Sequence, residues 1–288
     1  MQPMFSSTNS AALLLWILAQ SGLVKTPDTL SERPHAESAR QVVAPAGPDT
    51  KAGTPGREFF VSWGYNGDRF TKSDMQVSQP SLGNDFTLVG VQARDSKGWN
   101  NLFTHSLFVP QYNIRIGVFF NESWGLEVAL DHFKWIVKQD QQVRMTGTLN
   151  GAAVDTQITL TPDVLRYQLN NGANPLFVNL IRRVRLAGAP GRTGHVSLLA
   201  KAGGGFAFPH TENTVFGQPN ASGFQFFHGW DVDAAAAVRI HILKRLYFEF
   251  EEKLVYARYF GVKIDRGTAR HSVKASEYTW NFGMAFRK

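Results

Sequence analysis

The stretch Phe224–Phe260, FQFFHGWDVDAAAAVRIHILKRLYFEFEEKLVYARYF, predicts two long β-strands joined by a tight turn near Leu243-Lys244. Alternate side chains of a strand point to opposite faces of its sheet. One face of each strand is then apolar and the other carries charge, and only Glu252 breaks the alternation in the second strand. In that strand the apolar face holds Leu246, Phe248, Phe250, Leu254 and Tyr256, and the other face holds Tyr247, Glu249, Glu251, Lys253, Val255 and Ala257.

The same alternation recurs along the chain, in strands longer than the roughly 5–6 residues usual in soluble proteins. Long strands with one apolar and one polar face are typical of transmembrane β-barrels, whose wall faces lipid and whose interior is polar. We therefore predict an all-β fold, an antiparallel up-and-down barrel with a polar, plugged interior. The expected wall strands are 59–66, 110–120, 125–138, 174–187, 194–207, 224–242, 245–260 and 276–287.

Connection lengths support this arrangement, because barrels of this type have short periplasmic turns and long outer loops. An even number of strands also lets the first and last strands close antiparallel, which leaves no free edge in the membrane. We expect long outer loops at 67–108 and 139–172. The alternative is ten strands, with 86–94 and part of 139–172 added to the wall. Short connections at 121–123, 188–193 and 242–244 alternate with long ones at 139–172, 208–223 and 261–275.

Composition excludes several classes of function. The 288 residues include no cysteine, so disulfides, thiolate metal sites and Cys nucleophiles are absent. The net charge is +7, but its basic residues are scattered, which disfavours nucleic acid and favours phosphate-bearing lipid head groups. The 22 Phe, 7 Trp and 7 Tyr suit aromatic girdles at two membrane interfaces.

The N-terminal part of the chain differs from the rest in composition. The hydrophobic run Ala11–Val24 has the length of a signal-peptide core rather than of a membrane span. Residues 25–56 are rich in Pro, Ala, Thr and charge, which is typical of disorder. We predict a signal peptide at 1–21, a disordered periplasmic leader at 22–56 and an outer-membrane barrel at 57–288.

Twelve charged residues are expected to point into the barrel. An eight-stranded barrel is just wide enough for side chains to fill its interior. Buried charges require partners, and here six basic residues meet six acidic ones, which predicts an internal ion-pair network. A conducting or proton-relay path along the same residues is the alternative. The expected set is Arg115, Arg183, Arg185, Lys201, Arg239 and Lys253 with Glu127, Asp131, Asp231, Asp233, Glu249 and Glu251.

The closing strand YTWNFGMAF, residues 278–286, looks like the assembly signal of bacterial outer-membrane barrels. With the eight-strand architecture over 57–288, the chain resembles the small outer-membrane proteins of Gram-negative bacteria, the outer-membrane protein A and X type. The resemblance implies a location in the outer membrane and contact with its lipid and lipopolysaccharide. It also implies insertion by the barrel-assembly machinery through the C-terminal strand, and it sets no single function, because this fold hosts adhesins, inert anchors and lipid-modifying enzymes.

Some small barrels of this type deacylate lipid A, so hydrolase chemistry is a further possibility for this sequence. Those enzymes carry His and Ser two residues apart, whereas His105-Ser106 and His271-Ser272 are adjacent and so point to opposite faces. If a catalytic group existed, His271, Ser272, Ser276 and Glu277 would form it. We predict no enzymatic activity.

The resulting prediction is a monomer with a structural or surface-interaction role that binds through its outer loops, without cofactor or metal. A lipid A-modifying hydrolase and a small ion or solute channel are the alternatives.

Overall fold

The computed structural model describes residues 56–98 and 110–288. By its internal contacts the chain divides into two units, Met1–Gly56 and Arg57–Lys288, and the second carries all the structure described below. The predicted signal peptide and leader lie outside the described residues, apart from Gly56. Within the described residues, no helix is long and apolar enough to cross a membrane.

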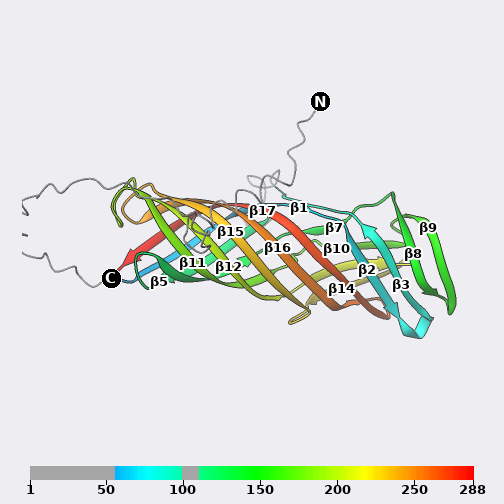
Figure 1. The fold of residues 1–288 in the computed structure, drawn as a ribbon. Helices are drawn as coiled ribbons and strands as arrows, with labels where there is room; N and C mark the ends of the chain where they lie inside the picture. The colour runs from blue at the N-terminus through cyan, green and yellow to red at the C-terminus, as the bar shows by residue number, and fades with distance from the viewer. Residues whose placement is uncertain (1–55, 99–109) are drawn as a thin grey trace, which may run out of the picture. The chain divides into compact units, whose positions relative to one another are not determined.

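Eight strands of the described chain form a closed antiparallel ring, because β1 pairs with both β5 and β17 (Figure 1). We call the end of this ring that carries the turns 120–123, 188–195 and 242–245 its lower end, and the opposite end its upper end. The prediction of an eight-stranded antiparallel barrel is thus confirmed. In ring order the strands are β1 (Glu58–Phe70), β5 (Tyr112–Phe119), β6 (Trp124–Asp131), β11 (Pro175–Ala187), β12 (Val196–Ala207), β15 (Gly229–His241), β16 (Leu246–Ile264) and β17 (Gly267–Arg287).

The remaining strands form a cap above the upper end of the ring. Four of them extend the barrel sheet beyond β17, in the order β2 (Ser73–Gln79), β3 (Asn84–Val91), β8 (Gln141–Leu149) and β9 (Ala152–Leu160). A short 3-10 helix, η1 (Pro80–Leu82), joins β2 to β3. The other strands form a separate five-stranded sheet in the order β14 (Gln218–Phe224), β13 (His210–Val215), β10 (Leu165–Leu169), β7 (Trp135–Val137) and β4 (Ala93–Arg94).

A hairpin turn at Leu149-Asn150-Gly151 joins β8 to β9. Asn150 and Gly151 both have positive φ angles, 50° and 79°, as a two-residue hairpin turn of this kind requires. This turn lies against Gly83, whose carbonyl accepts a 2.9 Å hydrogen bond from the Gly151 amide. A Cβ atom on Gly83 would lie 2.7 Å from that amide nitrogen, so the close approach requires glycine.

Several predicted boundaries are wrong, all at the upper end. The predicted strand 125–138 ends at Asp131, and part of its remainder is β7 of the second sheet. The strand expected to begin at 224 begins at Gly229. The expected loop 261–275 is reduced to a turn at 265–266, because β16 and β17 continue into the cap as a hairpin.

The ten-strand alternative is also wrong, because the segments considered for it lie in the cap. Residues 84–91 form β3, which pairs with β2 and β8 rather than with the wall. The expected loops 67–108 and 139–172 therefore contain strands that pair with each other across long sequence separations.

Candidate functional site

Eleven of the twelve charged residues predicted to face inward are buried inside the ring. They occupy alternate positions on the wall strands, so their side chains share the inner face while the apolar neighbours face outward. The eleven are Arg115, Glu127, Asp131, Arg183, Lys201, Asp231, Asp233, Arg239, Glu249, Glu251 and Lys253.

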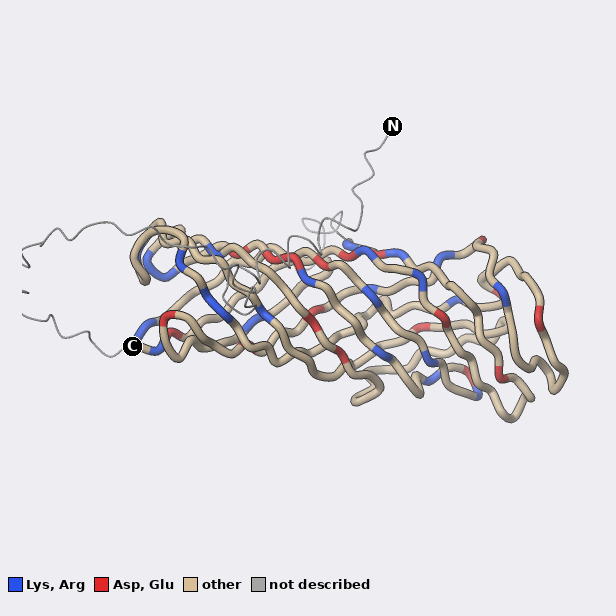
Figure 2. The backbone as a smooth tube through the Cα atoms, viewed as in Figure 1, with Lys and Arg blue, Asp and Glu red and all other residues tan. Residues whose placement is uncertain are grey.

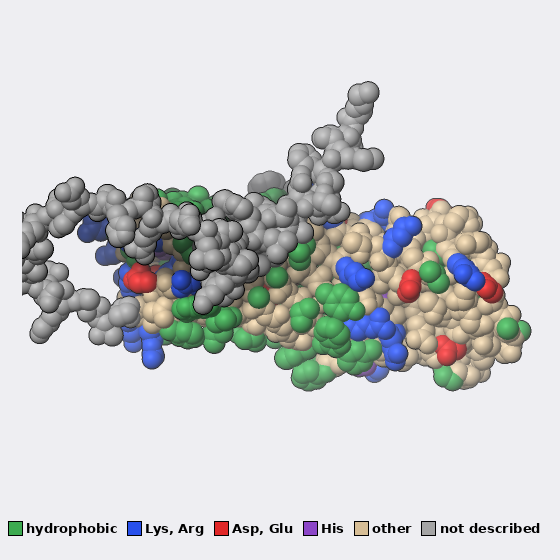
Figure 3. All heavy atoms as spheres, viewed as in Figure 1, with side chains coloured by type: hydrophobic (Ala, Val, Ile, Leu, Met, Phe, Trp, Pro, Cys, Tyr) green, Lys and Arg blue, Asp and Glu red, His purple; other side chains and the backbone are tan. Residues whose placement is uncertain are grey.

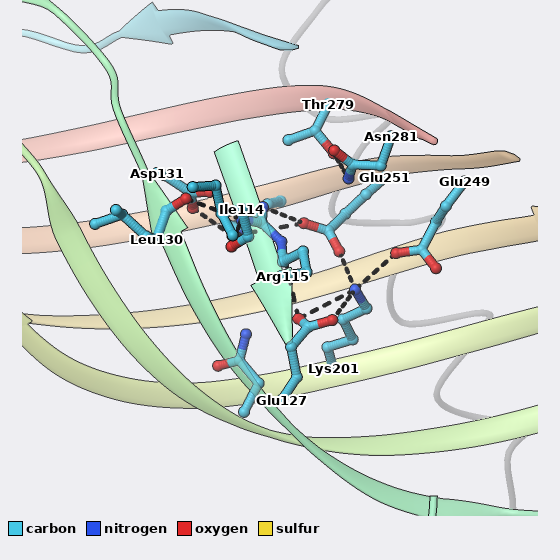
Figure 4. A network of polar contacts seen from close by, with 12 residues as sticks. Ile114, Arg115, Glu127, Leu130, Asp131, Lys201, Glu249, Glu251, Thr279 and Asn281 are labelled. Atoms are coloured by element: carbon cyan, nitrogen blue, oxygen red, sulfur yellow. Dashed lines mark hydrogen bonds and ion pairs between the residues drawn. The ribbon is translucent and has the colours of Figure 1, made fainter. Parts of the chain in front are cut away.

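Lys201 on β12 is the centre of the ion pairs (Figure 4). Its Nζ atom lies 3.0 Å from Glu127 Oε2, 2.8 Å from Glu249 Oε1 and 2.6 Å from Glu251 Oε2. All four side chains are fully buried. One ammonium therefore balances carboxylates from two strands, β6 and β16, and ties opposite parts of the wall together.

Arg115 and Lys253 continue the network upward. Arg115 bonds Asp131 and lies 3.3 Å from Glu251 and 3.9 Å from Glu127. Lys253 Nζ lies 2.6 Å from Asp131 Oδ2. The same nitrogen lies 3.5 Å from Asp233 Oδ2 and 3.5 Å from Glu251 Oε1.

Two further arginines extend the network toward the lower end. Arg239 donates from Nε to Glu249 Oε2 at 2.6 Å, and its guanidinium lies 4.1 Å from the ring centre of Tyr247. Arg183 donates from Nη1 to Glu58 Oε1 at 2.5 Å and lies 3.8 Å from the ring centre of Phe119. Stacking on aromatic faces suits guanidinium better than ammonium, which fits arginine at both positions.

The prediction for Arg185 is wrong, because this side chain is exposed. It lies near the lower end of β11, where the register with β12 shifts between Arg185 and Ala187. Arg185 itself is still in register with the buried Ser197, so its exposure comes from its place at the open lower end of the ring rather than from a change of face. Asp231 is buried as predicted, but no cation of the described residues lies within 4 Å of it.

The expected charge balance of six against six is also wrong. Glu58, Asp68 and Glu277 are buried too, so the described chain has five buried cations and nine buried carboxylates. Glu58 and Asp68 lie an even number of residues from the inward Ser62 on the same strand, so the alternation itself predicts their direction. An isolated buried carboxylate binds a proton rather than staying charged, so the surplus implies bound protons.

Above the charged layer the interior becomes apolar. His271 lies in this region, stacked on Trp135 with ring centres 4.4 Å apart and on Tyr259 with ring centres 5.0 Å apart. Its Nε2 atom lies 3.2 Å from the hydroxyl of Tyr167. Burial lowers the pKa of His271 to about 3. The imidazole of His271 is therefore neutral at physiological pH and packs in the core as a flat aromatic group.

The four residues considered for hydrolysis do not form a catalytic group. His271 is enclosed in the aromatic core, whereas Ser272 accepts a 2.9 Å hydrogen bond from Arg258. Ser276 donates to Glu252, and Glu277 instead accepts from the side chain of Asn66. His105 and Ser106 lie outside the described residues. Among the described residues no cluster of His, Asp or Glu has the geometry of a metal site.

No protein-family model matches the chain. No curated protein matches its sequence either. Some solved structures are similar in fold. One is the crystal structure of Ail, the attachment invasion locus protein of Yersinia pestis, in complex with the heparin analogue sucrose octasulfate. Its sequence is 13% identical to this chain, the TM-score is 0.34, and the match covers 81% of this chain and 99% of Ail. The outer membrane protein OprG from Pseudomonas aeruginosa is 10% identical with a TM-score of 0.35, covering 82% of this chain and 98% of OprG.

A third similar structure is that of the outer membrane protein AlkL, solved by solid-state NMR in lipid bilayers. It is 8% identical with a TM-score of 0.35, and the match covers 85% of this chain and 98% of AlkL. At such identities and TM-scores the similarity carries no argument about function. The fold of this chain, a small β-barrel of the outer-membrane type, follows from its own closed ring.

Proposed function

We propose that this protein is a closed outer-membrane barrel that acts through its outer cap, as a structural or surface-interaction protein without enzymatic activity. The observation that carries the proposal is the filled interior. A charged layer around Lys201 occupies the lower half, and an aromatic core around His271 occupies the space above it. Two layers of packed side chains favour a scaffold over a channel.

The outward face of the ring supports a position in a membrane. On β17 the apolar stripe runs from Tyr278 to Phe286, which at about 3.3 Å per residue is about 26 Å along the strand. With a tilt of about 40° this gives a band of about 20 Å, and the stripe on β15 from Trp230 to Ile240 gives about 25 Å. These values agree with the apolar band of about 25 Å that such barrels carry.

Side chains on the surface change in character between the ring and the cap. Figure 3 shows hydrophobic groups spread over the visible side of the ring, and mainly other side chains with scattered charges beyond it. Exposed apolar residues of the ring include Phe59, Val61, Ile116, Leu126, Val128, Val178, Leu180, Val232, Phe250, Phe282 and Met284. These exposed apolar side chains suit the predicted contact with outer-membrane lipid and lipopolysaccharide. The monomeric state and the role of the barrel-assembly machinery remain predictions.

The hairpin of β8 and β9 is the part of the cap best placed for recognition. It lies at the end of the extended sheet, and among the described strands β9 has a partner on one side only, β8. An unpaired strand edge is a site at which another chain can add. The hairpin also exposes polar side chains, among them Gln142, Arg144 and Asp155. Loops and hairpins on a rigid scaffold commonly carry binding.

The first test concerns the interior. We expect the purified protein to migrate differently on a gel before and after boiling, and to give no stepwise conductance in a planar bilayer. Lipid A from cells that express it should have an unchanged acylation pattern. Stepwise conductance would support the channel alternative, and shortened lipid A chains would support the hydrolase.

The second test concerns the cap. Cells that display the protein should adhere to at least one member of a panel of immobilised polysaccharides, lipopolysaccharides and proteins. The triple variant Gln142→Ala, Arg144→Ala, Asp155→Ala should lose this adhesion while its heat-modifiability is unchanged. The matched control, Arg192→Ala with Arg245→Ala at the lower end, should adhere normally. Equal adhesion of both variants would refute recognition by the hairpin.

A further inference from the structure

A pocket of about 490 Å³ opens at the lower end of the ring, away from the cap. It lies between the turn after β5, the lower part of β11 and the turn before β12. Lys and Arg residues gather at this end, beside the C-terminus (Figure 2). The lining residues are Glu122, Ser123, Arg182, Arg183, Val184, Arg185, Pro190, His195 and Arg287.

Two buried side chains of this pocket retain unused hydrogen-bonding atoms. Arg183 is 3% exposed; its Nε donates to the Glu122 carbonyl and its Nη1 to Glu58, but Nη2 has no hydrogen-bond partner among the described residues. His195 is buried, with Nε2 3.1 Å from the Ser197 hydroxyl, while Nδ1 has no partner there. Buried polar atoms without partners are costly, and both atoms belong to side chains that line the pocket, so a ligand that reaches them after a small side-chain movement would supply the missing partners.

The charge of the lining indicates which ligand. Four arginines line the pocket, and Glu122 is the one carboxylate among its lining residues. Arg287 donates to that carboxylate at 2.5 Å, and Arg182 lies 5.0 Å from the ring centre of Trp124. Arg183 is paired with Glu58 beneath the pocket. Arg185 is exposed at its rim, so the lining has a clear positive surplus.

We propose that this pocket binds an oxyanion of the phosphate class, held by Arg182, Arg183 and Arg185. Guanidinium groups bind phosphate oxygens through paired, charge-assisted hydrogen bonds. The free Nη2 of Arg183 supplies a buried donor. His195 adds a second donor in the tautomer that carries its proton on Nδ1, because Nε2 then accepts from Ser197. The phosphate group belongs either to a free ion or to the head group of an anionic phospholipid at the inner leaflet.

The test uses the full-length protein in an uncharged maltoside detergent, so that no detergent phosphate competes. Inorganic phosphate is titrated and binding is followed by calorimetry. Arg182→Gln and Arg185→Gln should each weaken binding by about tenfold, since each removes one charge-assisted contact at about 1.4 kcal/mol per tenfold. The matched controls Arg192→Gln and Arg245→Gln carry the same change at exposed positions of the lower end that do not line the pocket, and should bind as the unchanged protein does.

A second arm separates the two sources of phosphate. The protein is placed in nanodiscs of phosphatidylcholine with and without phosphatidylglycerol, and enrichment of the anionic lipid around it is measured by mass spectrometry of the released lipids. Enrichment that falls in Arg182→Gln and Arg185→Gln but not in the controls identifies the lipid head group as the ligand. Binding of free phosphate with the same dependence, and no enrichment, identifies the free ion.

Two outcomes would overturn the proposal. One is phosphate or lipid binding that all four variants retain equally, which would mean non-specific attraction to a basic surface. The other is no binding in either arm by the unchanged protein. Both readouts leave the cap untouched, so they are independent of whether the cap binds a surface.

Discussion

The charged interior of the ring and the apolar interior of the cap meet along β16 and β17, the two strands that run through both. On β17 the inward side chains are Ala269, His271, Val273 and Ala275 in the cap, and Glu277, Thr279 and Asn281 in the ring. The outward side chains change in the opposite sense, from Arg270 and Lys274 to Tyr278 and Trp280. Alternate residues of β17 face inward and outward along the whole strand, but near Ser276 the inward side chains change from apolar to polar and the outward ones from polar to apolar. Ser276 therefore marks the level at which the surroundings of the outer face change from water to lipid.

The largest expected effect comes from removing the cation at the centre of the charged interior. Lys201→Met leaves Glu127, Glu249 and Glu251 without their shared partner. Breaking a buried ion pair in this way costs about 3–5 kcal/mol, and we expect the urea midpoint of unfolding in detergent to fall accordingly. Lys263→Met, an exposed lysine on β16, is the control. A loss of unfolding free energy below about 1 kcal/mol, well under the ~3–5 kcal/mol expected for a broken buried pair, would show that the network contributes little to stability.

A truncation in the apolar interior should act on the cap alone. Leu88 on β3 is fully buried, and Leu88→Ala should destabilise the cap by about 3 kcal/mol through the cavity it leaves. Amide hydrogen exchange should accelerate in β2, β3 and β8 but not in β12. The neighbouring Val89 is exposed on the same strand, so Val89→Ala should change neither the stability of the cap nor its rate of amide exchange. Equal acceleration in β12 would mean that ring and cap unfold as one unit.

Acid should weaken the cap through His271. Its pKa is lowered to about 3 in the folded protein, against about 6.5 in an unfolded chain. Between these values the unfolded state binds the proton, so stability is full above about pH 6.5 and falls as the pH decreases toward 3. From pH 7 to pH 5 the cost of opening the cap should decrease by about 2 kcal/mol.

The variant His271→Phe should remove this dependence, since phenylalanine keeps the stacking on Trp135 and Tyr259 and does not titrate. Protease digestion of the cap as a function of pH measures the effect. An unchanged pH profile in the variant would assign the acid sensitivity to other groups, such as the surplus carboxylates of the ring.

The smallest expected effect is at the surface of the cap. Arg144 pairs with Asp155 at 2.6 Å, but both side chains are more than half exposed. Surface ion pairs contribute little to stability, so Arg144→Gln should leave the unfolding midpoint unchanged within error. A clear loss of stability would mean that an exposed ion pair of the cap can stabilise the fold as strongly as a buried pair of the ring.

The ring could be predicted from the sequence because one physical constraint acts along each wall strand. Lipid outside demands an apolar residue at every second position, as in Tyr278–Phe286, and the pattern is local. The same constraint predicted eleven of the inward charges. It failed at Arg185, which is exposed at the open lower end of β11, and at Glu58 and Asp68, which lie just beyond the predicted strand 59–66. Glu277 lies within the predicted strand 276–287, on the same face as the inward Thr279 and Asn281, so the alternation also predicts its direction although it was not counted.

The cap was less predictable because its order depends on pairing between distant segments. The ten-strand alternative places the run 86–94 in the wall, but its partners lie in β2 and in β8, the latter more than fifty residues further on. Strand β10 pairs with β13 and β7, and none of these is longer than six residues. Short strands that alternate weakly have no local signal for choosing a partner. The pocket at the lower end was missed for a similar reason, since three separate segments line it.

Strand β17 belongs to both the ring and the cap, which has a consequence for the order of assembly. Its lower part pairs with β1, more than two hundred residues earlier in the chain, and its upper part pairs with β2, almost two hundred residues earlier. A ribosome completes β17 after every other strand of the ring and cap, so β2 has no place to dock until then. Contacts of such long range form slowly. Closure of the wall and docking of the cap are thereby coupled, and a chain that has not yet closed its barrel has no complete outer surface to present.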